Sequence, residues 1–328
     1  SIDNGIANLG IVAQELRAAV FLTVLPMQAG AAQLLIPVGR IIGLQLQNET
    51  ITVAAYDDAL GPHAREAGLK IGDEIIKIDS REVTCVEDIR SALQTGAEVE
   101  LTVRRGSKLD TIPIAPQQTE DGPRLGVYLR QGIAGIGTVT FYDPETGIFG
   151  TLGHGVSDSR GGLLHMTRGS AYGADILSVK KGKSGEPGQL KGSAQGPEPF
   201  GTLLRNTPQG VFGITKQGWR GEPVPVAAFH EVTVGPAVIR SQVSGDRVQE
   251  YSVEIQKIYP QTRSDGRSFL LRITDPALLE TTGGIVQGMS GSPIIQDGKL
   301  VGAVTHVLVN DPTRGYGIFI ENMLDAAS

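Results

Sequence analysis

The chain has 328 residues and a formal net charge of -6, with hydrophobic residues making up 40% and charged residues 20% of it. These values are ordinary for a globular protein large enough for two domains, so they argue against a disordered chain and against a basic nucleic-acid-binding surface. The 44 glycines and 18 prolines indicate many turns and a mainly β fold, and the single cysteine, Cys85, excludes an intrachain disulfide.

The first 117 residues are predicted to form a lead segment at 1–31 and a compact module at 32–117. The stretch from Leu9 to Met27 is apolar, but Glu15 and Arg17 interrupt it, so no membrane span is predicted. A capping box of Thr84 and Glu87 marks the start of a helix. Strand patterns in the module lie at 41–47, 51–55, 74–78 and 98–104, and helical patterns at 62–67 and 86–93.

A polar linker at 116–123 precedes a larger domain, predicted at 118–328. Short strand patterns recur through this domain, which favours a β sandwich or barrel. They lie at 137–142, 176–179, 210–214, 224–227, 231–239, 251–258 and 268–273. The residues at 181–200 are rich in Gly, Ser and Pro and predict an exposed loop.

One histidine of this domain stands in a frame of small residues, Gly150-Thr151-Leu152-Gly153-His154-Gly155. Glycines on both sides leave the imidazole open to a partner, as a general base requires. The other four histidines lack this frame or lie elsewhere, and His306 follows the serine motif on a strand, where it is placed to line a pocket. His154 is therefore the preferred base.

A serine stands in a similar frame, Gly288-Met289-Ser290-Gly291-Ser292-Pro293, on a turn between two apolar runs. Glycines here permit left-handed backbone and leave room for a substrate carbonyl. Ser290 is the candidate nucleophile, and the amides of Gly288 and Ser290 are candidates for an oxyanion hole. Ser292 is a weaker candidate because Pro293 restricts its backbone. The rival interpretation of the motif is a Gly/Ser turn of a β domain.

A catalytic triad also needs a carboxylate to orient the histidine. Spacing does not choose among the aspartates between the two motifs. Asp275 ends a strand pattern and precedes Pro276, which is equally typical of a helix N-cap. The candidates are Asp158, Asp175, Asp246, Asp265 and Asp275. The sequence shows no metal-ligand cluster and no phosphate-binding glycine loop, so no metal or cofactor is predicted.

The module at 32–117 resembles a PDZ domain of the kind attached to bacterial proteases. The resemblance rests on the run from Ala64 to Asp79, which contains Gly68-Leu69-Lys70-Ile71-Gly72-Asp73, and on the helix 86–93. It implies that Ile41, Ile42, Gly43 and Leu44 form the loop that binds a peptide C-terminus through backbone amides.

With both motifs, the chain from about Leu35 onward resembles the SpoIVB peptidase family of endospore-forming bacteria. The most specific runs are 135–144, Leu152-Gly153-His154 and 283–294. The resemblance implies a mainly β fold, in which the PDZ domain is followed by a chymotrypsin-like double β-barrel. It implies a serine endopeptidase with His154 as base, Ser290 as nucleophile and Asp275 as orienting acid, although Asp275 lies unusually close to the serine, so Asp158 and Asp246 stay open.

Members of this family act in signalling, so the resemblance also implies a cellular location and binding partners. It implies an extracytoplasmic enzyme in the forespore intermembrane space, with an upstream membrane anchor in family members. It implies cleavage of itself and of a regulator of a membrane-embedded protease, which activates a late sigma factor, and PDZ binding of peptide termini. The alternatives are a PDZ-bearing scaffold with an inert protease fold and a general quality-control protease. Met289 stands where many chymotrypsin-like enzymes hold an aspartate, so we expect activation by a route that needs no ion pair there.

Overall fold

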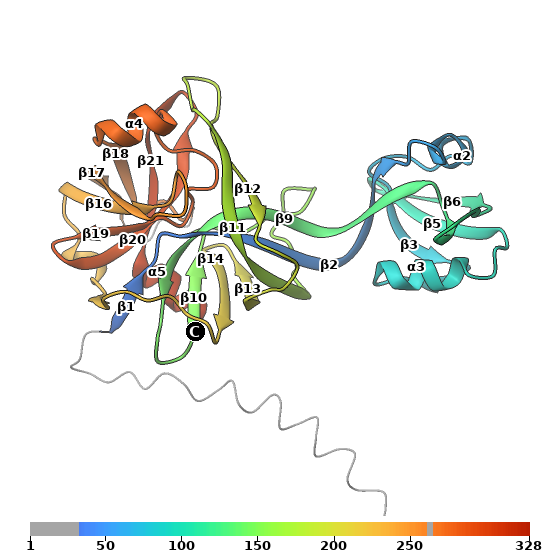
Figure 1. Ribbon diagram of the computed structural model, residues 1–328, viewed down its shortest axis with the longest axis horizontal. Coiled ribbons are helices and arrows are strands. Elements are labelled where there is room, and N and C mark those ends of the chain that lie inside the picture. Colours follow the sequence, from blue (N-terminus) through green and yellow to red (C-terminus); the bar gives the residue numbers. More distant parts are fainter. Residues whose placement is uncertain (1–32, 261–264) are drawn as a thin grey trace, which may run out of the picture. The chain divides into compact units, whose positions relative to one another are not determined.

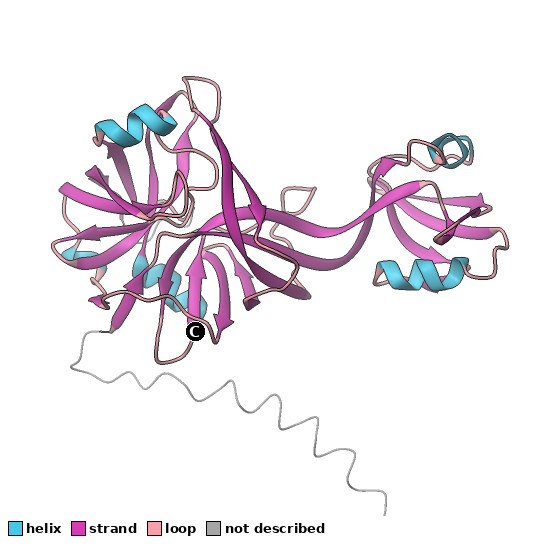
Figure 2. Ribbon diagram, viewed as in Figure 1, coloured by secondary structure: helices cyan, strands magenta, loops and turns pink. Residues whose placement is uncertain are grey.

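A computed structural model describes residues 33–260 and 265–328, and it is mainly β, as predicted (Figure 2). The predicted lead segment at 1–31 lies outside the described residues. Within the described part of the chain, no helix has the length and apolar character needed to cross a membrane.

Six strands close a first barrel through the pairing order β9-β10-β14-β13-β11-β2 and back to β9. Buried apolar side chains such as Leu44, Val139, Phe149 and Val211 form its core. Three short strands extend the sheet, because β1 pairs with β9, β15 pairs with β1 and β12 pairs with β11. The strands are β1 (Leu34–Pro37), β2 (Ile41–Tyr56), β9 (Val127–Tyr142), β10 (Ile148–Thr151), β11 (Arg168–Lys180), β12 (Gln189–Ala194), β13 (Gly201–Thr207), β14 (Gly210–Thr215) and β15 (Val224–Pro225).

A compact module is inserted between β2 and β9 of this barrel. Both strands continue out of the barrel and into the module, where they still pair with each other (Figure 1). The module has a core of its own, which includes Ile51, Leu69, Ile89 and Leu101. Its other elements are α2 (Gly61–Glu66), β3 (Glu74–Ile78), β4 (Arg81–Glu82), α3 (Val86–Leu93), β5 (Val99–Arg105), β6 (Lys108–Ile114), β7 (Gln117–Thr119) and β8 (Gly122–Arg124).

This insertion divides the chain differently from the predicted boundaries at 31/32 and 117/118. Strand β1 and the first part of β2 pair within the barrel, at positions that the prediction gave to the module. Conversely, residues 127–131 pair with the module part of β2, at positions that the prediction gave to the larger domain. The passage from barrel to module occurs in mid-strand, where no change of composition marks it.

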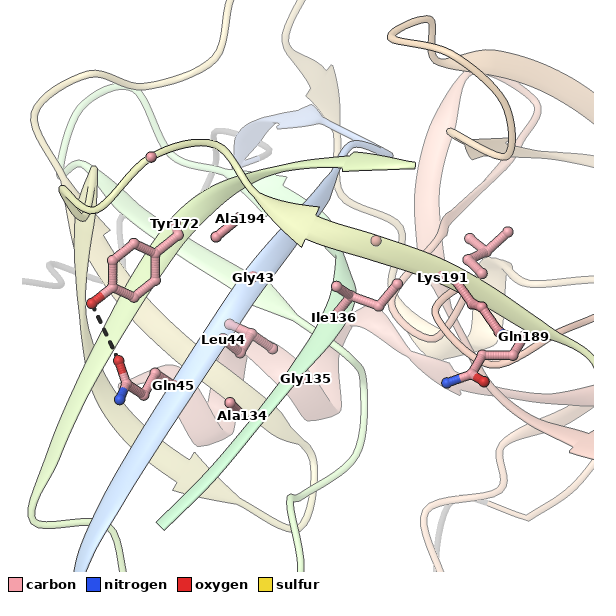
Figure 3. A pocket seen from close by; sticks show the side chains of 13 residues that line it. Gly43, Leu44, Gln45, Ala134, Gly135, Ile136, Tyr172, Gln189, Lys191 and Ala194 are labelled. Atoms are coloured by element: carbon pink, nitrogen blue, oxygen red, sulfur yellow. Dashed lines mark hydrogen bonds between the residues drawn. The ribbon is translucent and has the colours of Figure 1, made fainter. Parts of the chain in front are cut away.

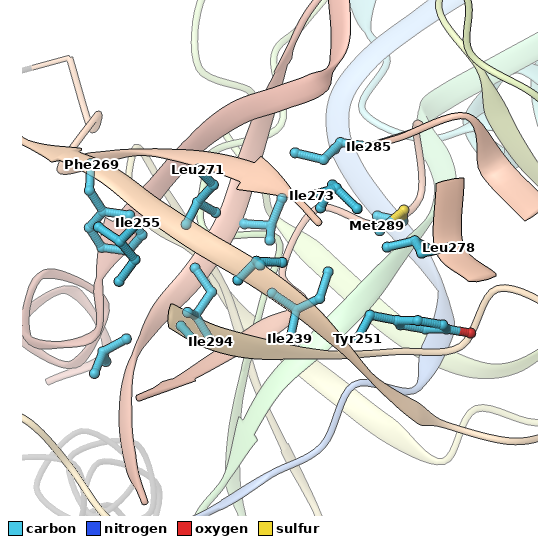
Figure 4. Close-up of a cluster of buried hydrophobic side chains, with 14 of the residues drawn as sticks. Ile239, Tyr251, Ile255, Phe269, Leu271, Ile273, Leu278, Ile285, Met289 and Ile294 are labelled. Atoms are coloured by element: carbon cyan, nitrogen blue, oxygen red, sulfur yellow. The ribbon is translucent and has the colours of Figure 1, made fainter. Parts of the chain in front are cut away.

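A second closed barrel has the strand order β16-β17-β18-β21-β20-β19. The fold is thus a double β-barrel, as the resemblance implied. A large buried apolar cluster fills the second barrel and includes Ile239, Ile255, Leu271 and Met289 (Figure 4). The elements are η2 (Phe229–Glu231), β16 (Gly235–Ser241), β17 (Gln249–Ile258), β18 (Phe269–Ile273), α4 (Pro276–Thr282), β19 (Pro293–Gln296), β20 (Lys299–Leu308), β21 (Asp311–Phe319) and α5 (Ile320–Ala327).

Two local predictions differ from the structure. Helix α3 has the predicted bounds, but its N-cap is Cys85 instead of Thr84, and the Asp88 carboxylate, rather than Glu87, accepts hydrogen bonds from the amides of Thr84 and Cys85. The loop expected at 181–200 contains β12, which pairs along β11. The glycine-rich composition of this segment does not predict a strand, and β12 forms because it pairs with β11.

Candidate active site

The nucleophile loop lies between α4 and β19 and depends on two left-handed glycines. Gly288 has φ +101° and Gly291 has φ +97°, a conformation that L side chains rarely adopt. A side chain at position 291 would also overlap the carbonyl of Thr138. Ser290, half-buried between these two glycines, donates its hydroxyl hydrogen bond to the carbonyl of Thr305 on β20 at 2.9 Å.

Two threonines of β9 hold this loop from the other barrel. The hydroxyl of Thr138 donates to the carbonyl of Gly288 at 2.7 Å, and that of Thr140 donates to the carbonyl of Gly291 at 2.7 Å. The amide of Thr138 also donates to the carbonyl of Ser290 at 3.0 Å. Both threonine side chains are fully buried, so they fix the loop where water does not compete for its carbonyls.

His154 lies just after β10, where Gly153 turns the chain with φ +69°. Its Nδ1 is 2.9 Å from the carbonyl oxygen of Gly155. A carbonyl only accepts, so Nδ1 carries the proton and Nε2 is left with a free lone pair. Burial lowers the pKa of His154, against a smaller opposite effect of the bond to Gly155, which favours the neutral base near neutral pH.

A second imidazole stands beside the first. The rings of His154 and His306 have centroids 5.1 Å apart and planes inclined at 36°. Burial, followed by the neighbouring His154 and Arg267, lowers the pKa of His306 to about 4. Both rings are therefore neutral at pH 7. His306 also lines a cavity, as was expected of this residue.

Two of the three predicted catalytic residues, Ser290 and His154, line one cavity of about 480 Å³. Its lining includes Ser290, His154, His306 and Gly288. In the described part of the chain, the amides of Gly288 and Ser290 donate no hydrogen bond, so both remain available to an oxyanion. The cavity thus holds an alcohol, a neutral imidazole and two amide donors.

Asp275 does not join this group. It is the N-cap of α4, and its Oδ1 accepts hydrogen bonds from the amides of Ala277 and Leu278 at 3.0 and 3.2 Å. Its Oδ2 accepts from the amide of Ser252 at 3.2 Å. No hydrogen bond or ion pair of the described residues links Asp275 to an imidazole. The structure therefore gives Asp275 the capping role that its place before Pro276 also predicted, in place of the orienting role.

The predicted PDZ loop is also elsewhere. Residues Ile41, Ile42, Gly43 and Leu44 form the start of β2 in the first barrel, with β9 paired along one edge and β11 along the other. A strand paired on both edges has no amides left for a peptide carboxylate. The prediction of this loop was wrong, because it assumed that the loop stands at the N-terminal end of the module.

A groove of about 440 Å³ lies instead between α3 and the start of β9. Val86, Ile89 and Leu93 of α3 line one side, and Val127 and Leu129 of β9 line the other. The turn before β9 is Leu125-Gly126, with φ +81° at Gly126, and within the described residues neither amide of this turn donates a hydrogen bond. Such a turn, with an open strand edge after it, suits a peptide C-terminus. The sequence feature that could have located this turn is the apolar-Gly-apolar run at 125–127, which the sequence analysis did not use.

The geometry agrees with the comparisons of the whole chain with known families. A family model described as SpoIVB peptidase S55 matches residues 121–324. The chain belongs to this family. A PDZ domain model matches residues 60–105, within the inserted module. The chain therefore combines a domain of this peptidase family with a PDZ domain. The described residues contain no cluster of three His, Cys, Asp or Glu side chains suited to a metal.

Individual relatives match shorter stretches. A putative zinc metalloprotease of Rhizobium meliloti (strain 1021), R01501, is 30% identical over 142 residues, which cover 42% of this chain and 36% of the relative. Another of Agrobacterium fabrum, Atu1380, is 35% identical over 77 residues, 23% of this chain and 20% of the relative. The chain thus spans about a third of the length of these relatives, or less.

Two forms of the Rv3671c protease are among the solved structures that match the chain. The active form from M. tuberculosis is 17% identical, with a TM-score of 0.38 over 59% of this chain and 74% of that one. The inactive form is 15% identical, with a TM-score of 0.34 over 60% and 85%.

Proposed function

We propose that Ser290 is the nucleophile and His154 the general base of this endopeptidase. The observation that carries the proposal is the shared cavity, in which Ser290, a neutral imidazole and the unused amides of Gly288 and Ser290 lie together. These are the groups that acyl transfer by a serine requires.

The reaction starts from a resting hydroxyl. Ser290 Oγ–H now donates to the Thr305 carbonyl, so its side chain must turn toward His154 Nε2 before attack. His154 then takes the proton while Oγ attacks the peptide carbonyl, and the two amides stabilise the negative oxygen. The protonated imidazole gives its proton to the leaving amine. Water hydrolyses the acyl-enzyme in a second passage through the same steps.

We assign the orientation of the base to the Gly155 carbonyl instead of a carboxylate. The bond from Nδ1 at 2.9 Å fixes the tautomer that presents Nε2 to the serine. A carbonyl stabilises an imidazolium less than a carboxylate does, so the lowered pKa of His154 is consistent with this arrangement. The Asp275 carboxylate accepts hydrogen bonds from three backbone amides, so we assign it to the stability of α4 and not to the orientation of the imidazole.

We further propose that the enzyme acts in sporulation signalling outside the cytoplasm. In this role it cleaves itself and a regulator of a membrane-embedded protease, and so leads to activation of a late sigma factor in the mother cell. The family match and the PDZ groove support a peptidase that chooses few substrates by their termini. A general quality-control protease would instead cut many unfolded sequences.

The hydroxyl of Ser290, held by the Thr305 carbonyl, favours one rival function, a scaffold with an inert protease fold. A fluorophosphonate probe separates the two functions. We expect wild-type protein to be labelled on Ser290 and both Ser290→Ala and His154→Gln to lose labelling, whereas an inert scaffold would take up no label. Cleavage of a peptide library should then yield few preferred sequences, since a broad profile would favour quality control.

A further inference from the structure

The edge of β9 next to the nucleophile is open. Thr138 directs its amide to the carbonyl of Ser290, away from β2. Backbone directions repeat every second residue along a strand, so the amide and carbonyl of Ile136 face the same way. Strand β9 pairs on this edge only at 139–142, and among the described strands none covers the edge from 127 to 137.

Cavities flank both faces of this open edge. The cavity of about 480 Å³ that contains Ser290 is lined by Leu46 and Ile133, among other residues. A second cavity of about 690 Å³ lies between β2, β9 and β12 and is lined by Gln45 (Figure 3). Gln45 and Leu46 are neighbours on β2 and point to opposite faces of the sheet. The two cavities share Ile136, so a strand added here would place alternate side chains in each.

The open edge of β9 begins in the PDZ groove, which is the groove between α3 and the start of β9. Residues 127–131 pair with β2 on one side only, and α3 stands across the groove on the other. The free amides of Leu125 and Gly126 mark where a carboxylate fits. A peptide anchored there runs antiparallel to β9, so its more N-terminal residues follow β9 from Val127 toward Ile136. One strand therefore connects a terminus-binding site with the nucleophile.

We propose that the substrate is a polypeptide with a free C-terminal carboxylate, held in the PDZ groove, and that β9 sets the distance from this end to the cut. The proposal rests on the proposed peptidase function of Ser290. Ile136 lies nine positions beyond Val127, and Thr138, which touches the nucleophile loop, two further. Since paired strands advance together at about 3.3 Å per residue, the scissile bond falls about ten residues before the C-terminus. The bulge at Gly132, with φ +83°, shifts this count by about one residue.

The test uses unstructured peptides of mixed sequence with a fixed end, digested by the full chain and mapped by mass spectrometry. We expect cuts to cluster about ten residues from the C-terminus. Lengthening the C-terminal tail by four residues should move the cuts by four residues, and amidation of the terminus should slow cleavage at least tenfold. The Ser290→Ala protein should bind a free-acid peptide, by fluorescence anisotropy, and not its amide.

A matched pair of variants tests the groove itself. Val86 is half-buried on the groove wall, so Val86→Glu places a negative charge in the groove, whereas Ser91→Glu places the same charge at an exposed position of α3 that does not line it. We expect Val86→Glu to lose the preference for free acids and Ser91→Glu to keep it, while Ser290 is still labelled by fluorophosphonate in both. Cuts that stay at fixed sequences when the tail is lengthened, or equal rates on acid and amide, would overturn the proposal while labelling persists. Loss of labelling in the wild type would instead remove the peptidase assignment and the proposal with it.

Discussion

The hydroxyl of Thr138 offers a sharp test of how the first barrel positions the nucleophile. Thr138→Val keeps the shape of the side chain and removes the 2.7 Å hydrogen bond to the Gly288 carbonyl. The site is fully buried, so the carbonyl loses its side-chain donor in a place closed to water, which costs about 1–3 kcal/mol of unfolding free energy. Because the amide of Gly288 is one of the two proposed oxyanion donors, a small displacement of this residue should also lower kcat/KM by about 10- to 100-fold.

Thr215→Val is the matched control. The Thr215 hydroxyl donates to the Phe200 carbonyl at 2.7 Å from a buried position in the first barrel, away from the nucleophile loop. Thermal unfolding and peptide cleavage should be measured on both variants. We expect similar losses of stability and a loss of activity for Thr138→Val alone. If Thr138→Val is destabilised like the control and cleaves at the wild-type rate, the threonine does not position the loop and the reasoning fails.

Three further predictions follow from the site. Asp275→Asn should retain the helix cap and nearly all activity, and Asp275→Ala should lower the free energy of unfolding by about 1 kcal/mol. If Asp275 were instead a triad carboxylate, its loss would lower kcat by about 10⁴-fold. Burial lowers the pKa values of His154 and His306, the latter to about 4, so the folded chain binds fewer protons than the unfolded chain at mildly acidic pH. The free energy of unfolding should therefore be highest above pH ~6.5 and fall as the pH drops toward ~4. The acid limb of the kcat/KM profile should have its midpoint below pH ~6.5. A midpoint at the ordinary histidine pKa would contradict this prediction. Met289 is fully buried in the core of the second barrel, so Met289→Leu should change activity little. Met289→Ala should lower the free energy of unfolding by about 2–5 kcal/mol, measured by thermal unfolding. A collapse of activity in Met289→Leu would contradict a purely packing role.

The sequence predicted a candidate nucleophile and a candidate base that share one cavity in the structure, because the features that mark such residues are local. Ser290 needs positive-φ glycines around it, and His154 needs small neighbours, so each motif is visible in a few consecutive residues. Met289 lies buried in the apolar core of the second barrel, where an aspartate would be costly (Figure 4).

Features that depend on distant pairing were not accessible in the same way. The hydroxyls of Thr138 and Thr140 look like ordinary strand residues until the second barrel brings its loop against them. The runs at Ile42-Gly43-Leu44 and Leu125-Gly126-Val127 have the same apolar-Gly-apolar pattern, and only the position of α3 beside β9 shows which one forms the groove. The group that we propose to orient His154 is the backbone carbonyl of Gly155, and a backbone group cannot be recognised from a residue type.

Fluorophosphonate labelling with peptide mapping tests most directly whether this alcohol and this imidazole act as a pair. The structure predicts a single adduct on Ser290, with labelling at least 10²-fold slower in His154→Gln and unaffected in Asp275→Asn. An adduct on Ser292, or labelling of Ser290 that is independent of His154, would contradict it.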